Sequence, residues 1–303
     1  MLDCGRPLSH FTGSESQPTG KTFAIVNQKG GVGKTTTAVN LSAALASLGY
    51  VILLVDFDPQ GNSTSGVGIS KGDLAMSVYD VIISGDPADH VIRRTSTSGL
   101  DILPSDVRLA GAEVELVAAI AREAKLKTAL RKAKEHYDAV IIDCPPSLGL
   151  LTINALTAAD ACLIPMQCEY YALEGLSSLL TTVNLILRHL NSELKVGGVL
   201  LTMVDSRIKL SDQVATEVRQ HFGDQVFQTV IPRSVRLAEA PSYGQPILTY
   251  APGSRGAVAY LDLAREFAGR AGLPTAQMRS TVERIEAAVV TSDQGGDDGD
   301  EHS

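Results

Sequence analysis

The sequence lacks the features of a membrane-spanning or disulfide-stabilised protein. No apolar run approaches the roughly 20 residues needed to cross a bilayer, and the first residues lack the apolar core of a signal peptide. Tryptophan is absent. Cysteine is scarce, and its few positions lack the spacing of metal ligands, which favours reduced thiols: Cys4, Cys144, Cys162 and Cys168. With 44% hydrophobic residues in 303, the chain can bury one large core or two small ones.

An excess of basic residues is also missing, since the net charge is -8. The charge is unevenly distributed. Residues 287–303 carry -5 and no lysine or arginine, which leaves about -3 for the remainder of the chain. A local basic face is compatible with that balance, so the total charge does not exclude a nucleic-acid partner.

A glycine-rich run between a predicted strand and a predicted helix is the clearest motif. Residues 22–27 are apolar and partly β-branched, which predicts a buried strand, and residues 37–49 have helical apolar spacing and end at a glycine. In such a loop, N–H groups turn toward an anion and the helix N-terminus adds partial positive charge. The pattern predicts a nucleotide-binding loop of Lys29, Gly30, Gly31, Val32, Gly33, Lys34, Thr35 and Thr36.

Two residues of this loop have predicted chemical roles. Lys34 would reach the terminal phosphates and take part in catalysis, and the Thr35 hydroxyl would bind Mg²⁺. The alternative, an ordinary glycine-rich turn, is disfavoured by the Gly-Lys-Thr ending and by the flanking strand and helix.

The loop departs from the general pattern G-x-x-x-x-G-K-[ST] at its start. Gln28 replaces the first glycine, and Lys29 adds a second lysine. This form resembles the deviant Walker A loop of the ParA/MinD superfamily. The resemblance implies that Lys29 crosses a dimer interface and acts in catalysis on the nucleotide of the other subunit, as a cation beside developing charge. The alternative is a solvated loop lysine.

Two aspartates follow the next predicted strand, the continuous apolar run 51–55. Ligands of open α/β sheets bind outside the carboxyl ends of the strands, so Asp56 and Asp58 are expected to face the nucleotide. The segment resembles switch I of the ParA family. By that resemblance Asp58 positions or polarises the attacking water, and Asp56 supports the Mg²⁺ region. The alternative is an Asx turn that caps a helix.

A third aspartate ends the apolar run 137–143. Asp143 is predicted to hold Mg²⁺ through water, as in a Walker B strand. Residues 144–147, Cys-Pro-Pro-Ser, resemble the family's switch II, whose backbone senses the γ-phosphate.

The remaining chain alternates predicted strands and helices. Strands are expected at 100–104, 160–165, 196–204 and 226–231, and a long helix at 169–190. A helical region is expected from Asp106 to about His136, with an apolar side formed by Leu109, Val114, Val117, Ile120, Leu126 and Leu130. The predicted fold is therefore α/β, a single doubly wound, mainly parallel sheet flanked by helices.

The predicted domain organisation has three parts. Residues 1–20 read as a disordered leader, and residues 21–270 as a P-loop ATPase domain. Residues 271–303 read as a C-terminal tail that is acidic and disordered after about 291.

The resemblance covers roughly residues 22–268 and is closest to chromosomal ParA proteins of the Soj type, with the run IPRSVRLAEAPSYGQPI at 231–247. Arg207 and Arg236 match family positions that contact DNA without sequence preference. Asp205 and Pro232 are the implied adenine contacts. The alternative for each arginine is a surface charge or a local salt bridge.

The implied function is DNA partitioning driven by ATP with Mg²⁺. An ATP-bound homodimer would bind double-stranded DNA non-specifically, and a ParB-type centromere-binding partner would stimulate a slow ATPase and release it. The expected location is the cytoplasm, on the nucleoid, without a membrane partner.

Three other functions use the same loop. A MinD-like membrane-associated positioning ATPase would need a basic amphipathic C-terminal helix, and the acidic tail of this chain does not match that requirement. An iron–sulfur carrier of the nitrogenase-reductase type would need paired cysteines that bridge subunits. A nucleotide-gated scaffold with little turnover stays open.

Overall fold

The structure is a computed structural model that describes residues 20–169, 172–205 and 209–274, with the backbone alone at 172–175 and 209–212. Arg207, nearly all of the predicted leader and most of the predicted C-terminal tail lie outside the described residues.

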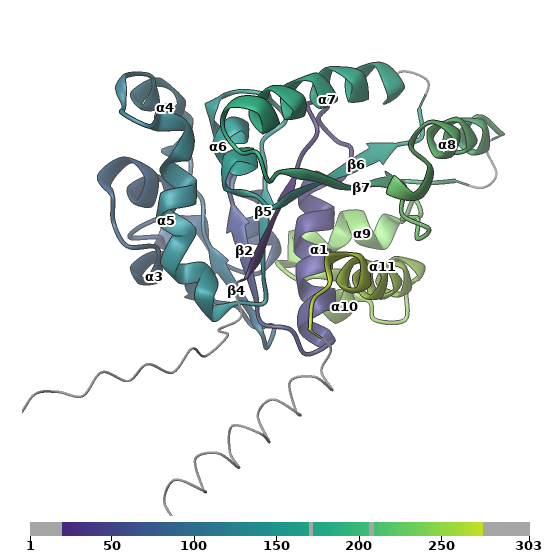
Figure 1. Ribbon diagram of the computed structural model, residues 1–303. Coiled ribbons are helices and arrows are strands. Elements are labelled where there is room, and N and C mark those ends of the chain that lie inside the picture. Colours follow the sequence, from purple (N-terminus) through teal and green to yellow (C-terminus); the bar gives the residue numbers. More distant parts are fainter. Residues whose placement is uncertain (1–19, 170–171, 206–208, 275–303) are drawn as a thin grey trace, which may run out of the picture.

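A seven-stranded sheet forms the centre of the molecule (Figure 1). The strands are β1 (Lys21–Ile25), β2 (Ile52–Asp56), β3 (Arg93–Arg94), β4 (Leu100–Leu103), β5 (Ala139–Asp143), β6 (Ala161–Gln167) and β7 (Lys195–Thr202). Their order is β3-β4-β2-β5-β1-β6-β7, and every pair is parallel except β3 with β4. The predicted doubly wound, mainly parallel fold is confirmed.

Helices cover both faces of the sheet. They are α1 (Lys34–Ser47), α2 (Asn62–Gly66), α3 (Ala88–Val91), α4 (Leu109–Glu115), α5 (Lys125–Ala133), α6 (Leu150–Ala158), α7 (Ala172–His189), α8 (Lys209–Phe222), α9 (Val235–Glu239), α10 (Ile247–Tyr250) and α11 (Arg255–Ala271). One core packs α1, α9, α10 and α11 on one face, and a second packs α4 to α8 on the other. Burial of apolar side chains in both cores provides the main driving force for folding.

The strand register brings the chemically important ends together. β2 and β5 are adjacent, and Asp56 pairs with Asp143 at their carboxyl ends. β1 lies on the other side of β5 and leads directly into the glycine-rich loop. The fold therefore places the loop and both aspartates at one edge of the sheet, where open α/β sheets bind ligands.

The predicted helical region 106–136 is not continuous in the structure. It divides into α4, the 3₁₀ turns η3 (Leu116–Ala118) and η4 (Arg122–Ala124), α5, and the turn η5 (Lys134–His136). Ala121 has a left-handed φ of 50°, which interrupts a right-handed helix. Because the chain changes direction there, Val114, Val117 and Ile120 are exposed instead of lying on a buried side.

The predicted strand 226–231 is also wrong. Val226 makes only an isolated bridge to Val199 of β7. The N–H groups of Gln228 and Thr229 donate instead to the Glu266 carboxylate of α11, at 2.8 and 2.9 Å. The N–H groups of Phe227 and Ile231 still donate to β7 carbonyls, but Glu266 takes two of the donors between them, so the segment runs beside β7 without forming a ladder.

Candidate nucleotide-binding site

The glycine-rich loop joins β1 to α1 and has the backbone of an anion cradle. Gly31 and Gly33 have φ values of 75° and 89°, in the left-handed region that favours glycine. Gly33 is the N-cap of α1, and no side chain among the described residues caps this helix. Its first N–H groups, with the positive end of the helix dipole, therefore face the loop.

The two lysines of the loop occupy different environments. Lys34 is buried, and its ammonium donates to the Lys29 carbonyl at 3.0 Å, inside the loop. Burial lowers the pKa of Lys34, while the charges of Asp143 and Asp58 oppose that shift. The Lys29 side chain is 45% exposed, and its ammonium pairs with Glu169. Lys34 thus points inward, whereas Lys29 is accessible from outside.

Asp143 is a buried carboxylate with one unused oxygen. Its Oδ2 accepts from the Ser63 hydroxyl at 2.8 Å, but its Oδ1 has no hydrogen-bond partner among the described residues. Burial and then the charge of Asp56 raise the pKa of Asp143, and the hydroxyls of Ser63 and Thr35 oppose that rise. A buried unpaired oxygen is costly, and Mg²⁺ prefers oxygen ligands. A divalent cation beside Thr35 and Asp143 fits this arrangement.

Asp56 supports the neighbouring loop with its own carboxylate. Its Oδ2 accepts from both the N–H and the hydroxyl of Thr64 at 2.7 Å, and its Oδ1 accepts from the Asp58 N–H at 3.3 Å. Burial raises the pKa of Asp56 to about 6, partly offset by these donors. The carboxylate fixes the loop that carries Asp58 next to the cation position.

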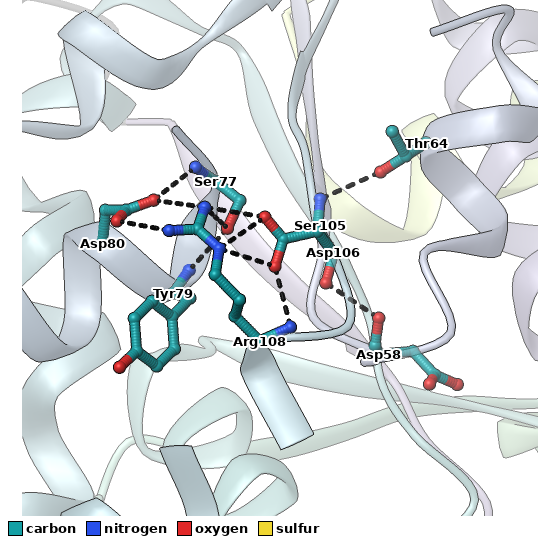
Figure 2. Close-up of polar contacts among 8 residues, drawn as sticks. All are labelled: Asp58, Thr64, Ser77, Tyr79, Asp80, Ser105, Asp106 and Arg108. Atoms are coloured by element: carbon teal, nitrogen blue, oxygen red, sulfur yellow. Dashed lines mark hydrogen bonds and ion pairs between the residues drawn. The ribbon is translucent and has the colours of Figure 1, made fainter. Parts of the chain in front are cut away.

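Asp58 is held at the edge of the site by its main chain and by its side chain. Its carbonyl accepts from the Ser105 hydroxyl at 2.9 Å, which ties this loop to the end of β4 (Figure 2). Its Oδ1 accepts from the Gln60 N–H at 2.9 Å, so the residue also forms an Asx turn. The buried Asp58 carboxylate is near enough to Lys34 to affect the pKa of that lysine.

A cavity of about 320 Å³ lies directly behind the loop. Gly33, Thr36, Met203, Pro232 and Tyr260 are among its lining residues. Its position beside the loop and its largely apolar wall suit a planar base. Asp205 lines an adjoining cavity of about 1010 Å³ together with Pro232.

Thr202 is a residue of the site that the sequence did not single out. Its hydroxyl donates to the Val32 carbonyl at 2.8 Å and ties the loop to the end of β7. The sequence signal for this role was a polar residue near the carboxyl end of a predicted buried strand.

Of the two arginines predicted to contact DNA, one lies in the part of the chain that the structure describes. Arg236 lies on α9 with a side chain 62% exposed, and it pairs with Glu239 at 3.0 Å. Arg207 lies outside the described residues.

Comparison with known proteins identifies the family. The AAA_31 model, described as an AAA domain, matches residues 20–196. The chain is 60% identical over 249 residues to the sporulation initiation inhibitor protein Soj of Bacillus subtilis, covering 82% of this chain and 98% of that one. It is 52% identical over 251 residues to the chromosome partitioning protein ParA of Myxococcus xanthus, covering 83% and 89%. The chain belongs to the ParA/Soj family of chromosome-partitioning ATPases.

Two solved structures with bound nucleotide and magnesium share the fold of this chain. A structure named cobyrinic acid a,c-diamide synthase from Mycobacterium smegmatis, with bound ADP and magnesium, superposes with a TM-score of 0.73 at 37% identity, covering 84% of this chain and 98% of that one. The septum site-determining protein MinD of Pyrococcus horikoshii, complexed with Mg-ADP, gives 0.69 at 27% identity, covering 83% and 97%. Within the described residues of this ParA/Soj-family chain, no helix has the length and apolar character of a membrane span.

Proposed function

We propose that residues 21–270 form an ATPase domain that partitions DNA, and that its ATP-bound dimer binds DNA non-specifically until a ParB-type partner stimulates hydrolysis. The observation that carries the proposal is the buried Asp143 oxygen without a partner, beside an anion cradle that contains an inward lysine. The near full-length similarity to Soj supports the partitioning role.

ATP is the proposed substrate. The N–H groups of residues 30–36 bind its phosphates, Lys34 contacts the terminal phosphates, and the cavity at Pro232 takes the base, with Asp205 at its rim. Thr35 and Asp143 hold Mg²⁺, and Asp56 supports that position through its loop. The ion supplies positive charge that neutralises the charge developing on the phosphates.

Two residues are assigned to hydrolysis. Asp58 orients the attacking water from the loop fixed by Asp56 and Ser105. Lys29, exposed at the mouth of the site, reaches the nucleotide of the second subunit in a sandwich dimer. Because each site lacks that lysine until the dimer closes, turnover by the isolated chain is expected to be slow.

DNA binding then depends on the nucleotide. Arg236, with Arg207, contributes phosphate contacts. A dimer doubles their number, and counterion release makes the affinity steeply dependent on salt. This protein would reside in the cytoplasm, on the nucleoid, because its proposed ligand is chromosomal or plasmid DNA.

The test is binding to non-specific duplex DNA with ATP, with ADP and without nucleotide, across a salt series. Tight binding only with ATP, weakening steeply with salt and lost in Lys34→Ala, supports the proposal. Equal binding in all nucleotide states contradicts the switch. Binding to anionic lipid vesicles but not to DNA would favour a MinD-like role instead.

A further inference from the structure

Arg236, the arginine assigned to DNA contact, is already engaged within its own chain. Its Nη1 donates to Glu239 Oε2 at 3.0 Å, three residues further along α9. The Tyr250 hydroxyl donates to the same oxygen at 3.1 Å. We call Arg236, Glu239 and Tyr250 the Arg236 cluster. Within this cluster the guanidinium has a carboxylate counterion before it meets any phosphate.

The Tyr250 hydroxyl that holds Glu239 is itself fixed by packing. The Tyr250 ring stacks on Tyr243, with centroids 4.9 Å apart and an angle of 28° between the rings. Tyr250 ends α10, and the N–H of Ile247 at the start of α10 donates to Asn40 Oδ1 at 2.7 Å. Asn40 in turn donates to the Thr36 carbonyl at 2.8 Å. The Arg236 cluster is therefore anchored on α1, which packs on the same face of the sheet as α9 and α10 (Figure 1).

The Glu239 carboxylate and a DNA phosphate compete for one guanidinium. Both are anions that accept charge-assisted hydrogen bonds from arginine N–H groups. The Arg236 and Glu239 side chains are 62% and 39% exposed, and ion pairs as exposed as this one are weak. A phosphate can therefore displace Glu239, but the pair must first break, and the freed carboxylate stays nearby and repels the phosphate. Both effects lower the affinity of Arg236 for DNA without abolishing it.

We propose that Glu239, held in place by Tyr250, is a built-in counterion that lowers the DNA affinity of Arg236. This inference rests on the proposed function, in which Arg236 contacts DNA phosphates. Because each copy of the chain then binds DNA weakly, tight binding requires the joint contacts of two copies. Glu239 thus acts as a positioning residue that helps to confine DNA binding to the ATP-bound dimer.

The test removes the charge of Glu239 and keeps its shape. Glu239→Gln retains an oxygen acceptor for Tyr250 and Arg236 but carries no charge. The matched control is Glu123→Gln, because Glu123 pairs with Arg122 at 2.8 Å in the turn η4, beside α6 on the opposite face of the sheet. Binding to non-specific duplex DNA with ATP and with ADP is measured across a salt series for each protein, together with thermal unfolding and ATP-analogue binding.

Glu239→Gln should tighten ATP-dependent DNA binding about fivefold at low salt, because each of two copies loses one competing ion pair. The slope of log affinity against log salt should steepen by about 1 per copy. The unfolding midpoint and the ATP affinity should stay at the wild-type level, since Glu239 is partly exposed and lies outside the phosphate loop. The control should bind DNA like the wild type.

A second measurement asks whether Glu239 acts through Arg236. In the background of Arg236→Ala, Glu239→Gln should no longer tighten DNA binding, because the guanidinium for which the carboxylate competes is gone. A merely structural role for Glu239 would lower the unfolding midpoint, and it would not produce tighter binding with a steeper salt dependence.

Three results would overturn the inference. If the wild type binds DNA with ATP and Glu239→Gln binds it equally well or more weakly, Glu239 does not restrain Arg236. If Glu239→Gln tightens binding just as much in the absence of Arg236, the carboxylate does not act through this arginine. If the wild type binds no DNA in any nucleotide state, the proposed function itself fails, and the inference fails with it.

Discussion

Replacing Thr202 with valine should weaken ATP binding by loosening the phosphate loop that the Thr202 hydroxyl holds. The Thr202 hydroxyl donates to the Val32 carbonyl at 2.8 Å, and Thr202 is 2% exposed. Valine preserves the shape of the side chain but removes the donor. The carbonyl that precedes Gly33 then loses its partner in a buried position, at the turn where the loop enters α1.

The size of the effect follows from the cost of an unsatisfied buried acceptor, about 1–3 kcal/mol. For a chain of 303 residues, each kcal/mol lowers the unfolding midpoint by about 1.5–2 °C. If the lost hydrogen bond makes the phosphate-binding conformation of the loop about 1 kcal/mol less favourable, ATP affinity falls about fivefold.

The assay pairs thermal unfolding with titration of a fluorescent ATP analogue. The control is Thr157→Val, because Thr157 is equally buried and its hydroxyl donates to the Ile153 carbonyl at 2.7 Å, within α6 and away from the loop. The control should lose stability without losing ATP affinity. If Thr202→Val likewise loses stability but keeps its ATP affinity, Thr202 has only a structural role and the predicted link to ATP binding is refuted.

Three further predictions test other parts of the site. Asp58→Ala should slow phosphate release at least about 100-fold in single turnover while ATP binding persists; rapid release would remove its assigned role. Arg236→Ala should weaken ATP-dependent DNA binding about fivefold with dimerisation intact, whereas Arg265→Ala, which removes a similarly exposed, ion-paired arginine of α11, should leave DNA binding unchanged. Burial raises the pKa of Glu266, but two main-chain N–H groups and an arginine outweigh burial, so the net pKa is lowered. The ionised Glu266 therefore stabilises the fold at neutral pH, and this contribution is lost on acidification. The difference in unfolding midpoint between the wild type and Glu266→Gln should narrow between about pH 7 and pH 3.

Local patterns explain why so much of the fold could be predicted. The apolar runs before the glycine-rich loop, before Asp56 and before Asp143 each became a strand of the sheet. The strands of a parallel sheet have their carboxyl ends on the same side, so the sequence alone predicted that the loop and both aspartates would meet. The family resemblance added roles for individual residues, and those roles stay predictions.

Tertiary hydrogen bonds explain what could not be predicted. Thr202 lies 170 residues from the carbonyl it holds, and Ser105 lies 47 residues from Asp58. No local spacing encodes either contact. The incorrectly predicted strand at 226–231 has a related cause, because the N–H groups of Gln228 and Thr229 donate to Glu266, which is distant in sequence. Strand propensity identifies a segment that fits a sheet, but the available acceptors decide whether it joins one.

The error over Val114, Val117 and Ile120 has a different cause. Helical spacing of apolar residues reports that a face must be covered, and it does not report whether the cover is the same chain or another molecule. In the second half of the predicted helical region the expected burial holds, since Leu126 and Leu130 are buried against the core. In the first half, Leu109 and Leu116 supply the core contacts. The chain turns at Ala121, and the remaining apolar positions face solvent.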